Sequence, residues 1–138
     1  MINDYDIKID ETEDKAISEK IKKGVLEFYH GDRELKHFTL YIKDEHSNII
    51  AGIVGSHLRN LLNANLAWVM ENKRGQGLGK KLFAKLEIYA KEHNCHAIQL
   101  NTLHLEGKFF YEKLGYKLIG TLTEYYPGVN NYFMRKVL

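Results

Sequence analysis

The chain has 138 residues, of which 44% are hydrophobic and 28% are charged, and its formal net charge at pH 7 is +2. This length suits one folded domain over residues 1–138, and the small net charge excludes the strongly basic composition of many nucleic-acid-binding proteins. No apolar run approaches the roughly 20 residues of a membrane-spanning helix, and the single cysteine, Cys95, cannot form an internal disulfide. Since no leader pattern opens the chain, we expect a cytoplasmic protein without a nucleic-acid or membrane partner.

The N-terminal half is predicted to contain one helix and several strands. The helix is expected over residues 13–29, because apolar side chains recur at helical spacing at Ile17, Ile21, Val25 and Phe28. Strands are predicted at residues 4–9, 38–43, 49–57 and 61–70, the first of them weakly. Residues 44–48 form a polar segment, so the strands on either side of it should pair as a hairpin.

The C-terminal half alternates between helices and strands. Residues 77–93 are predicted to be a helix whose apolar face is formed by Leu78, Leu82, Phe83, Leu86 and Ala90. A second helix is expected over residues 106–114 and should end at Gly115. Strands are predicted at residues 96–101, 116–122 and 131–137, with a turn at Tyr126-Pro127-Gly128. We therefore expect an α/β protein, with a mixed sheet flanked by helices.

The segment between the predicted strand at residues 61–70 and the helix that follows has the composition of an anion site. It has the sequence Arg74-Gly75-Gln76-Gly77-Leu78-Gly79. The first turn of a helix leaves backbone N–H groups without intrahelical partners, and its dipole favours negative charge there. Glycines let an anion approach those N–H groups, and Arg74, Lys80 and Lys81 can add charge-assisted contacts. The segment therefore predicts a pyrophosphate site.

Three known phosphate motifs can be compared with this segment. A dinucleotide fold needs G-x-G-x-x-G, but the glycines fall at positions 75, 77 and 79. A nucleotide P-loop needs Ser or Thr after Gly-Lys, and Gly79-Lys80 is followed by another lysine. The pattern R-x-x-G-x-G matches at Arg74, Gly77 and Gly79. A helix that merely begins after glycines is the alternative without a ligand.

At these residues the chain resembles the GNAT family of acetyltransferases. Residues 69–82 look like its pyrophosphate motif, and Phe109-Phe110-Tyr111-Glu112-Lys113-Leu114-Gly115-Tyr116 looks like its second signature. The resemblance implies the GNAT acyl-CoA N-acyltransferase fold, with a mixed sheet splayed between its fourth and fifth strands, and acetyl-CoA as cosubstrate. The pantetheine arm would pair with residues 66–70, and the pyrophosphate would lie on the N–H groups of residues 74–79. The implied cofactor-binding residues are Val69, Met70, Arg74, Gly75, Gln76, Gly77, Leu78, Gly79 and Lys80.

The resemblance assigns Tyr111 as the catalytic acid that protonates the departing thiolate. Packing with neighbouring aromatic side chains is the alternative role for this tyrosine. The general base stays open, because residues 63–70 hold no carboxylate where many relatives carry a glutamate. His57 and His104 have suitable unperturbed pKa values, and Asn101 or Thr102 could hold a water instead. Acceptor-pocket or sheet-packing roles are open for Tyr125, Tyr126 and Tyr132.

These features predict an N-acetyltransferase that passes the acetyl group of acetyl-CoA directly to a primary amine of a small molecule or peptide, in a ternary complex. No residues have metal-ligand spacing, so we expect no metal site. Two alternatives remain: an acyl-CoA-binding module with little or no catalysis, and a nucleic-acid-binding domain that uses the basic stretch at residues 73–91. The sequence leaves the acceptor open, and the oligomeric state stays open between a monomer and a homodimer.

Overall fold

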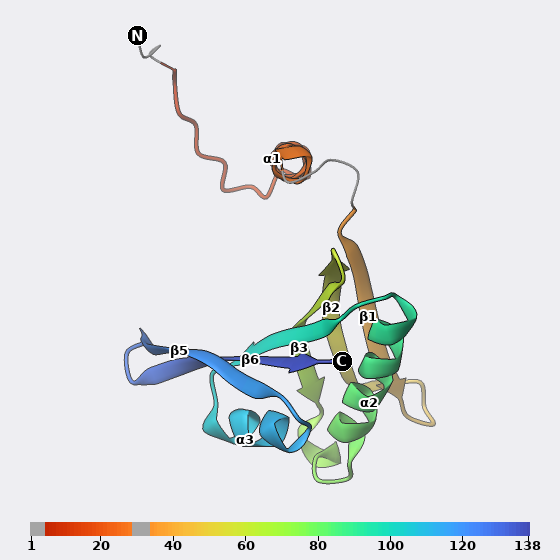
Figure 1. Cartoon of the computed structure of the whole chain (residues 1–138). Helices are drawn as coiled ribbons and strands as arrows, with labels where there is room; N and C mark the ends of the chain where they lie inside the picture. Colours follow the sequence, from red (N-terminus) through yellow and green to blue (C-terminus); the bar gives the residue numbers. More distant parts are fainter. Residues whose placement is uncertain (1–4, 29–33) are drawn as a thin grey trace. The chain divides into compact units, whose positions relative to one another are not determined.

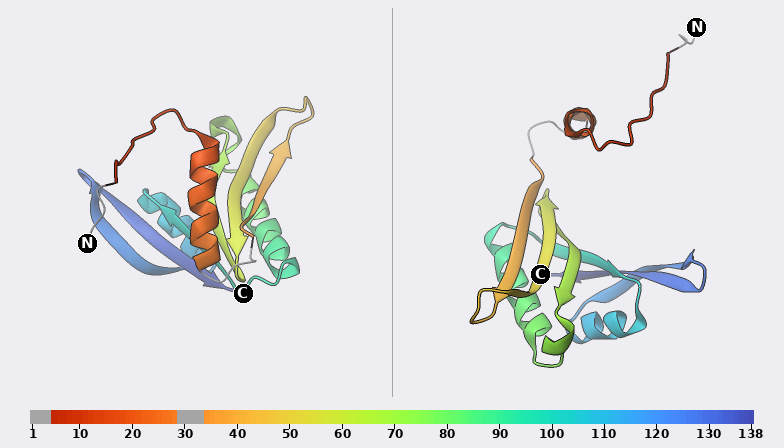
Figure 2. Two further views of the ribbon diagram at one scale, coloured as in Figure 1. Left: turned by 90° about the horizontal axis from the view of Figure 1, so that it is seen from above. Right: turned by 180° about the vertical axis from the view of Figure 1, so that it is seen from behind.

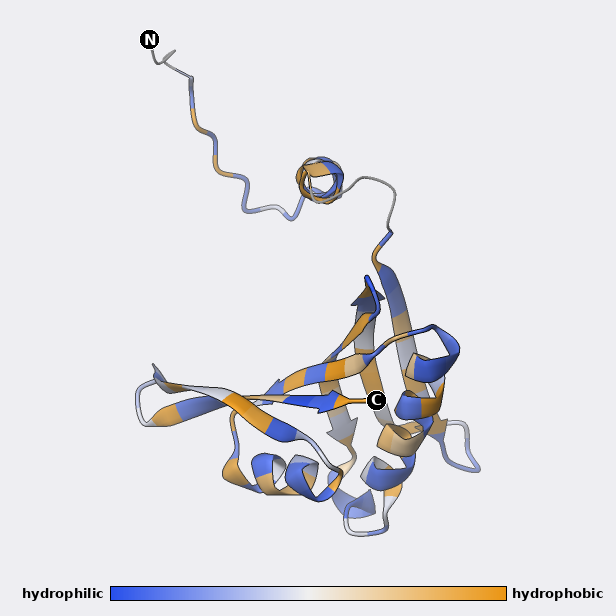
Figure 3. Cartoon of the chain, in the orientation of Figure 1, coloured by the Kyte–Doolittle hydropathy of each residue, from blue (hydrophilic) through white to orange (hydrophobic). Residues whose placement is uncertain are grey.

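The computed structural model describes residues 5–28 and 34–138, and the chain divides into two compact units, Met1–Glu34 and Leu35–Leu138. The first unit contains α1 (Lys15–Phe28), close to the helix predicted at residues 13–29, although Tyr29 lies outside the described residues. Asp14 caps this helix, because its Oδ1 accepts a hydrogen bond of 2.9 Å from the backbone N–H of Ala16. Figure 3 shows apolar and polar residues on different sides of α1.

The strand predicted at residues 4–9 is wrong over residues 5–9, which adopt no regular secondary structure. Residue 4 lies outside the described part of the chain. The physical reason is the absence of a pairing partner for residues 5–9 among the described strands, since a strand depends on hydrogen bonds to a neighbour. The splay that the sequence predicts between a fourth and a fifth strand therefore falls between strands that the structure numbers β3 and β4.

The second unit is built on a six-stranded mixed sheet in the order β1-β2-β3-β4-β6-β5 (Figures 1 and 2). Its strands are β1 (Lys36–Lys43), β2 (Ile49–Leu58), β3 (Leu61–Val69), β4 (Ala97–Thr102), β5 (Lys117–Tyr126) and β6 (Val129–Val137). Only β3 and β4 pair in parallel; the other neighbours are antiparallel. The hairpin expected from the polar segment at residues 44–48 is the β1–β2 pair.

The sheet splays between β3 and β4. These strands pair only through Leu61–Ala97, Leu62–Ile98 and Asn63–Gln99, at the start of each strand. A register shift in the β2–β3 pair takes Val54 opposite Leu66 and Gly55 opposite Ala64, so Asn65 is an extra residue on β3. Such a bulge bends a strand and increases its twist, which turns the rest of β3 away from β4.

Two helices pack against the sheet, as Figure 1 shows. The helix α2 (Leu78–Glu92) follows a short 3-10 turn, η1 (Glu71–Lys73), and buries Leu82, Phe83, Leu86 and Ala90. The second, α3 (Leu105–Lys113), contacts β4, β5 and β6. The sheet contributes core residues that include Ile53, Leu62, Ile98, Leu100 and Met134. Both helices were predicted to within two residues at each end.

The β5–β6 hairpin is longer than predicted. β5 runs to Tyr126 rather than to residue 122, and a register shift lies between Leu122 and Tyr126. Glu124 has a φ of +53°, and its backbone N–H donates to Asn130 Oδ1 at 3.1 Å. The alternation of side chains between the two faces of β5 is interrupted at this irregularity, so the sequence pattern predicts that β5 ends at residue 122. No helix among the described residues is long and apolar enough to cross a membrane.

Candidate functional site

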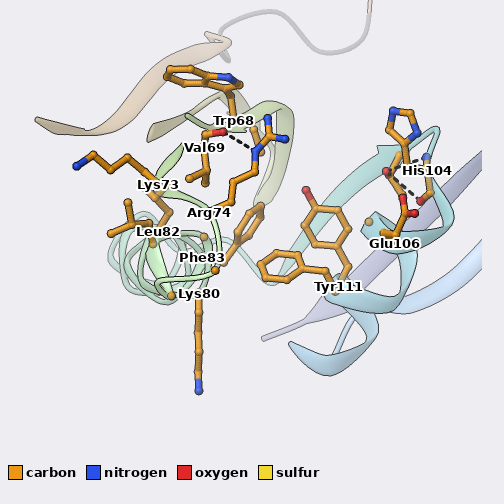
Figure 4. Close-up of a pocket in the computed structure, with 18 residues that line it drawn as sticks. Trp68, Val69, Lys73, Arg74, Lys80, Leu82, Phe83, His104, Glu106 and Tyr111 are labelled. Atoms are coloured by element: carbon orange, nitrogen blue, oxygen red, sulfur yellow. Dashed lines mark hydrogen bonds between the residues drawn. The ribbon is translucent and has the colours of Figure 1, made fainter. Parts of the chain in front are cut away.

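A cavity of about 650 Å³ lies where the end of β3, the loop after η1, the start of α2 and the helix α3 meet (Figure 4). Its size is within the usual range for ligand pockets. It is lined by Ala67, Trp68, Val69, Lys73, Arg74, Gly75, Gly77, Leu78, Gly79, Lys80, Leu82, Phe83, Thr102, His104, Glu106, Gly107, Phe110 and Tyr111. The structure thus brings Tyr111 into the same cavity as most of the predicted cofactor-binding residues. Met70 and Gln76 do not line it.

The loop before α2 offers a row of backbone N–H groups to this cavity. Gly75 and Gly77 have φ values of +77° and +82°, a conformation that glycine adopts without strain. Gly77 is the N-cap of α2, and the first intrahelical bond runs from Lys81 N–H to its carbonyl. In the part of the chain that the structure describes, no backbone acceptor bonds the N–H groups of residues 75–80. Free N–H groups at the positive end of a helix dipole can bind an anion, and we call this row the N–H cradle.

Arg74 ties this loop to the end of β3. Its Nε–H donates to the carbonyl oxygen of Val69 at 2.9 Å, and its backbone N–H donates to Glu71 O at 3.3 Å. The backbone N–H of Arg74 is therefore already used, so the free N–H groups begin at Gly75. The Arg74 guanidinium keeps other donors for a phosphate. Figure 4 shows the Lys80 side chain extending away from Tyr111.

The backbone of β3 presents alternate residues to the splay. The N–H of Met70 donates to Ile50 O at 2.8 Å, so Met70 faces β2. Because neighbouring residues of a strand direct their hydrogen-bonding groups to opposite sides, Val69 and Ala67 direct theirs toward β4, which does not pair with them. Val69 and Ala67 can therefore pair with an extended ligand in the splay, whereas Met70 cannot offer its N–H.

Aromatic rings on three sides hold Tyr111 in place. Its ring centroid lies 5.1 Å from that of Phe83, 5.2 Å from Phe110 and 5.7 Å from Tyr116. Burial raises the pKa of Tyr111, so its hydroxyl stays protonated at neutral pH. In Figure 4 this hydroxyl points away from α3 toward the open part of the cavity. Tyr111 is therefore a held phenol that can donate a proton to a group in the cavity.

The candidate bases are not equally placed. His104 and Thr102 line the cavity, and the backbone N–H of His104 donates to Thr102 Oγ1 at 3.3 Å. His57 does not line it: its Nε2 lies 3.2 Å from the hydroxyl of Tyr89, and its ring is 5.1 Å from that of His93. The structure therefore separates His57 from Tyr111, because β2 places it against the side of α2 that carries Tyr89.

The remaining predicted side chains lie elsewhere. Tyr125 and Tyr126 are exposed near the end of the β5–β6 hairpin with ring centroids 4.9 Å apart, and neither they nor Tyr132 line a described pocket. Cys95 is buried, and burial raises the pKa of its thiol.

Several lining residues were not predicted from the sequence. Glu106 lies in the first turn of α3 and is a carboxylate of this cavity. Gly107 lets α3 approach β4 closely, because a Cβ at this position would collide with Thr102 Oγ1. Leu82 and Phe83 reach the cavity from the apolar face of α2, where the sequence indicates only core packing. Of these residues, only Gly107 gave a signal in the sequence, because a glycine inside an otherwise helical segment often has a packing or functional role.

Known proteins similar to this chain are acetyltransferases. A model of the acetyltransferase (GNAT) family matches residues 5–116, which include the loop before α2 and Tyr111. Blasticidin-S acetyltransferase of Streptomyces morookaense is 32% identical over 107 residues, or 77% of this chain and 79% of that protein. An acetyltransferase crystal structure from Bacillus cereus ATCC 14579 is 28% identical, with a TM-score of 0.81, and the match covers 95% of this chain and 98% of that one. A proposed streptothricin acetyltransferase from Bacillus anthracis strain Ames, crystallised with acetyl coenzyme A, is 25% identical with a TM-score of 0.67, covering 76% of this chain and 64% of that one.

Proposed function

This chain belongs to the acetyltransferase (GNAT) family, and we propose that it transfers the acetyl group of acetyl-CoA directly to a primary amine in a ternary complex. Enzymes of this family use acetyl-CoA, and a relative binds it in a crystal structure. The observation that carries the proposal is the row of free N–H groups at residues 75–80, which opens onto the cavity that contains Tyr111. The single domain predicted from the sequence stays a prediction, which the span of the family match supports.

In this proposal the cofactor lies along the loop and the splay. Its pyrophosphate accepts hydrogen bonds from the N–H groups of residues 75–80, with added charge from Arg74. Its pantetheine arm pairs with the N–H of Val69 and with the backbone of Ala67, which β4 leaves without a partner, while the Val69 carbonyl stays bonded to Arg74. The thioester then reaches the part of the cavity near Tyr111, because α3 borders the splay from β4.

The chemical step needs one proton removed and one proton supplied. The neutral amine nitrogen attacks the thioester carbonyl carbon, forming the C–N bond, and the tetrahedral intermediate then breaks its C–S bond. The Tyr111 hydroxyl gives its proton to the departing sulfur, the proton that the nitrogen loses passes to solvent, and the Tyr111 phenolate regains a proton from solvent. The raised pKa of Tyr111 is consistent with a phenol that is protonated at the start of each turnover.

The acceptor is proposed to be a small molecule or a peptide. A relative at 32% identity is named for its action on blasticidin-S, which supports a small-molecule amine. The alternative from the sequence, an acyl-CoA-binding module with little or no catalysis, is consistent with the same cradle. Only turnover separates these two functions.

A thiol-release assay tests the proposed function. Purified protein is incubated with acetyl-CoA and a panel of small amines and peptides, and free thiol and acetylated product are measured together. Equimolar thiol and acetylamine are the expected products, with no acetyl-protein detected when the amine is omitted. Binding of acetyl-CoA without acetylation of any amine in the panel would instead establish the non-catalytic module.

A further inference from the structure

A second pocket, of about 200 Å³, lies at the same splay and is walled by amide side chains. Asn63 and Asn65 line it from β3, and Gln99 and Asn101 line it from β4. Its apolar wall includes Phe133 of β6. None of the described residues that line it is a carboxylate or a cation. Recognition in this pocket must therefore rely on uncharged hydrogen-bonding groups.

The amide pocket borders the cofactor cavity from the other face of the sheet. Leu100 packs in the core, so its neighbours Gln99 and Asn101 project from the opposite face of β4. Asn101 is followed directly by Thr102, which lines the cofactor cavity, and Asn65 of β3 is only two residues from Ala67. The two pockets thus approach each other within about 7 Å along each strand, at 3.3 Å per residue. An acceptor in the amide pocket would therefore lie near a donor in the cofactor cavity.

Outer hydrogen bonds orient two of the amides. Arg135 Nη1 donates to Gln99 Oε1 at 3.3 Å, and because a guanidinium can only donate, the amide NH₂ of Gln99 remains for the pocket. Asn101 Nδ2 donates at 3.1 Å to Oδ1 of the buried Asn131, so Oδ1 of Asn101 remains for the pocket. Neither remaining group has another hydrogen bond among residues 5–28 and 34–138. β4 therefore offers one donor and one acceptor on one face.

The charge around the amide pocket is positive. Arg135 contacts Gln99 and lies 3.0 Å from Nε2 of His96, and no carboxylate pairs with it in the described part of the chain. A second ammonium group on the acceptor would meet this charge without a compensating partner.

Resting on the proposed function, we propose that this pocket recognises an acceptor in which an uncharged carboxamide adjoins the accepting amine, an α-amino amide. The carboxamide C=O accepts from the Gln99 NH₂, and its N–H donates to Asn101 Oδ1. An α-amine has a pKa of about 7.7–8.0, so roughly a tenth of it is neutral at pH 7, far more than of an alkyl amine with a pKa of about 10.4. The reaction forms the C–N bond and breaks the C–S bond; the sulfur leaves with the proton of Tyr111, the amine proton passes to solvent, and solvent reprotonates Tyr111.

Three amines with one carbon skeleton test this specificity. L-Alaninamide carries the carboxamide, 1,2-diaminopropane replaces it with a second amine, and L-alanine replaces it with a carboxylate. For the wild-type protein we expect kcat/KM for L-alaninamide to exceed both others by about tenfold or more. The carboxylate of L-alanine cannot donate to Asn101 Oδ1 and the second ammonium of 1,2-diaminopropane cannot accept from the Gln99 NH₂, so each analogue loses one of the two hydrogen bonds and leaves its partner unpaired. Equal or higher kcat/KM for either analogue would overturn the proposal, as would acetylation of other amines but none of L-alaninamide.

Two substitutions locate the preference in the pocket. Gln99→Met removes the donor with little change of volume and should abolish the advantage of L-alaninamide, while KM for acetyl-CoA stays unchanged. Asn63→Asp adds a carboxylate of the same size and should raise kcat/KM for 1,2-diaminopropane relative to L-alaninamide. Circular dichroism verifies that both variants are folded. A folded Gln99→Met variant that keeps the wild-type ratio would contradict the assignment.

A binding experiment keeps this proposal separate from the proposed function. If no amine is acetylated, the proposed function fails, and the pocket is then tested by NMR titration of the CoA-saturated protein. L-Alaninamide should shift the Gln99 and Asn101 side-chain amide signals, and 1,2-diaminopropane should not. Equal shifts, or no shift from either amine, would overturn the recognition of a carboxamide.

Discussion

Removing the hydroxyl group of Tyr111 distinguishes a catalytic role of this residue from a packing role. Tyr111→Phe keeps the contacts with Phe83, Phe110 and Tyr116 and removes only the proton donor. We predict that kcat falls by about 10²–10⁴, the range for a positioned acid, while the free energy of unfolding changes by about 1 kcal/mol or less. Steady-state kinetics with a single acceptor amine measure the first, and urea unfolding the second. A folded variant within about threefold of wild-type kcat, with chemistry rate-limiting, would remove Tyr111 from the mechanism.

Tyr116 provides a matched control for Tyr111, because its ring centroid lies 5.7 Å from that of Tyr111. For Tyr116→Phe we expect a change in stability and none in kcat. Its hydroxyl is buried and has no hydrogen-bond partner in the described part of the chain, and burial raises the pKa of Tyr116. An unpaired buried hydroxyl is destabilising, so Tyr116→Phe should raise the free energy of unfolding by about 1 kcal/mol. Turnover should be unchanged, because this hydroxyl does not line the cavity. A loss of stability would show that the hydroxyl has a partner in solution.

The loop before α2 depends on the backbone of Gly77. A valine at φ +82° is strained by about 1–2 kcal/mol or more, although its Cβ would meet no protein atom. The branched side chain would project into the space beside the N–H cradle, so we predict that Gly77→Val abolishes acetyl-CoA binding in isothermal titration. Gly120→Val is the matched control, since Gly120 lies on β5 with open space around it and no positive φ. Undiminished binding by folded Gly77→Val would count against the cradle.

The contact between β2 and α2 should make stability depend on pH. Burial, followed by the charges of His93 and Lys36, lowers the pKa of His57 below its usual 6.5. The unfolded chain then binds more protons than the folded one, so this contribution to stability is present above pH 6.5 and is lost as the pH falls through the folded pKa. Urea unfolding between pH 8 and pH 5 should show a smaller decline for His57→Gln than for wild type. Parallel declines would exclude His57 as the source.

Local patterns predicted most elements and the loop, but contacts between distant segments were not predictable. Helical spacing and the glycines before Leu78 located α2 and its N-terminus. The Asn65 bulge opens the splay, yet one extra residue leaves no periodic signal. Likewise, the sequence makes His57 a candidate base, because its contact with Tyr89, 32 residues away in the chain, is visible only in the structure. Gly107 could be noticed in the sequence, but its contact with Thr102 depends on how α3 meets β4.

At the scale of the whole molecule, we propose that the opening of the sheet between β3 and β4 holds both the cofactor and the acceptor. The cofactor cavity and the amide pocket share β3 and β4, and on each strand their lining residues come within two positions of one another. This arrangement supports the proposed direct transfer, because neither substrate would have to leave before the other enters. The bulge in β3 and the close packing of α3 on β4 therefore matter to function although neither is itself a reacting group.

Ligand-dependent thermal unfolding of the wild-type chain tests the central claim, that the loop before α2 binds acetyl-CoA. Acetyl-CoA at 100 times its dissociation constant should stabilise the fold by about 2.7 kcal/mol, which raises Tm measurably. ATP and NAD carry phosphates but lack the pantetheine arm that pairs in the splay, so at the same concentration they should raise Tm far less. We predict a clear rise in Tm with acetyl-CoA for the wild-type protein and no rise for Gly77→Val. An equal shift with ATP, or no shift with acetyl-CoA, would contradict it.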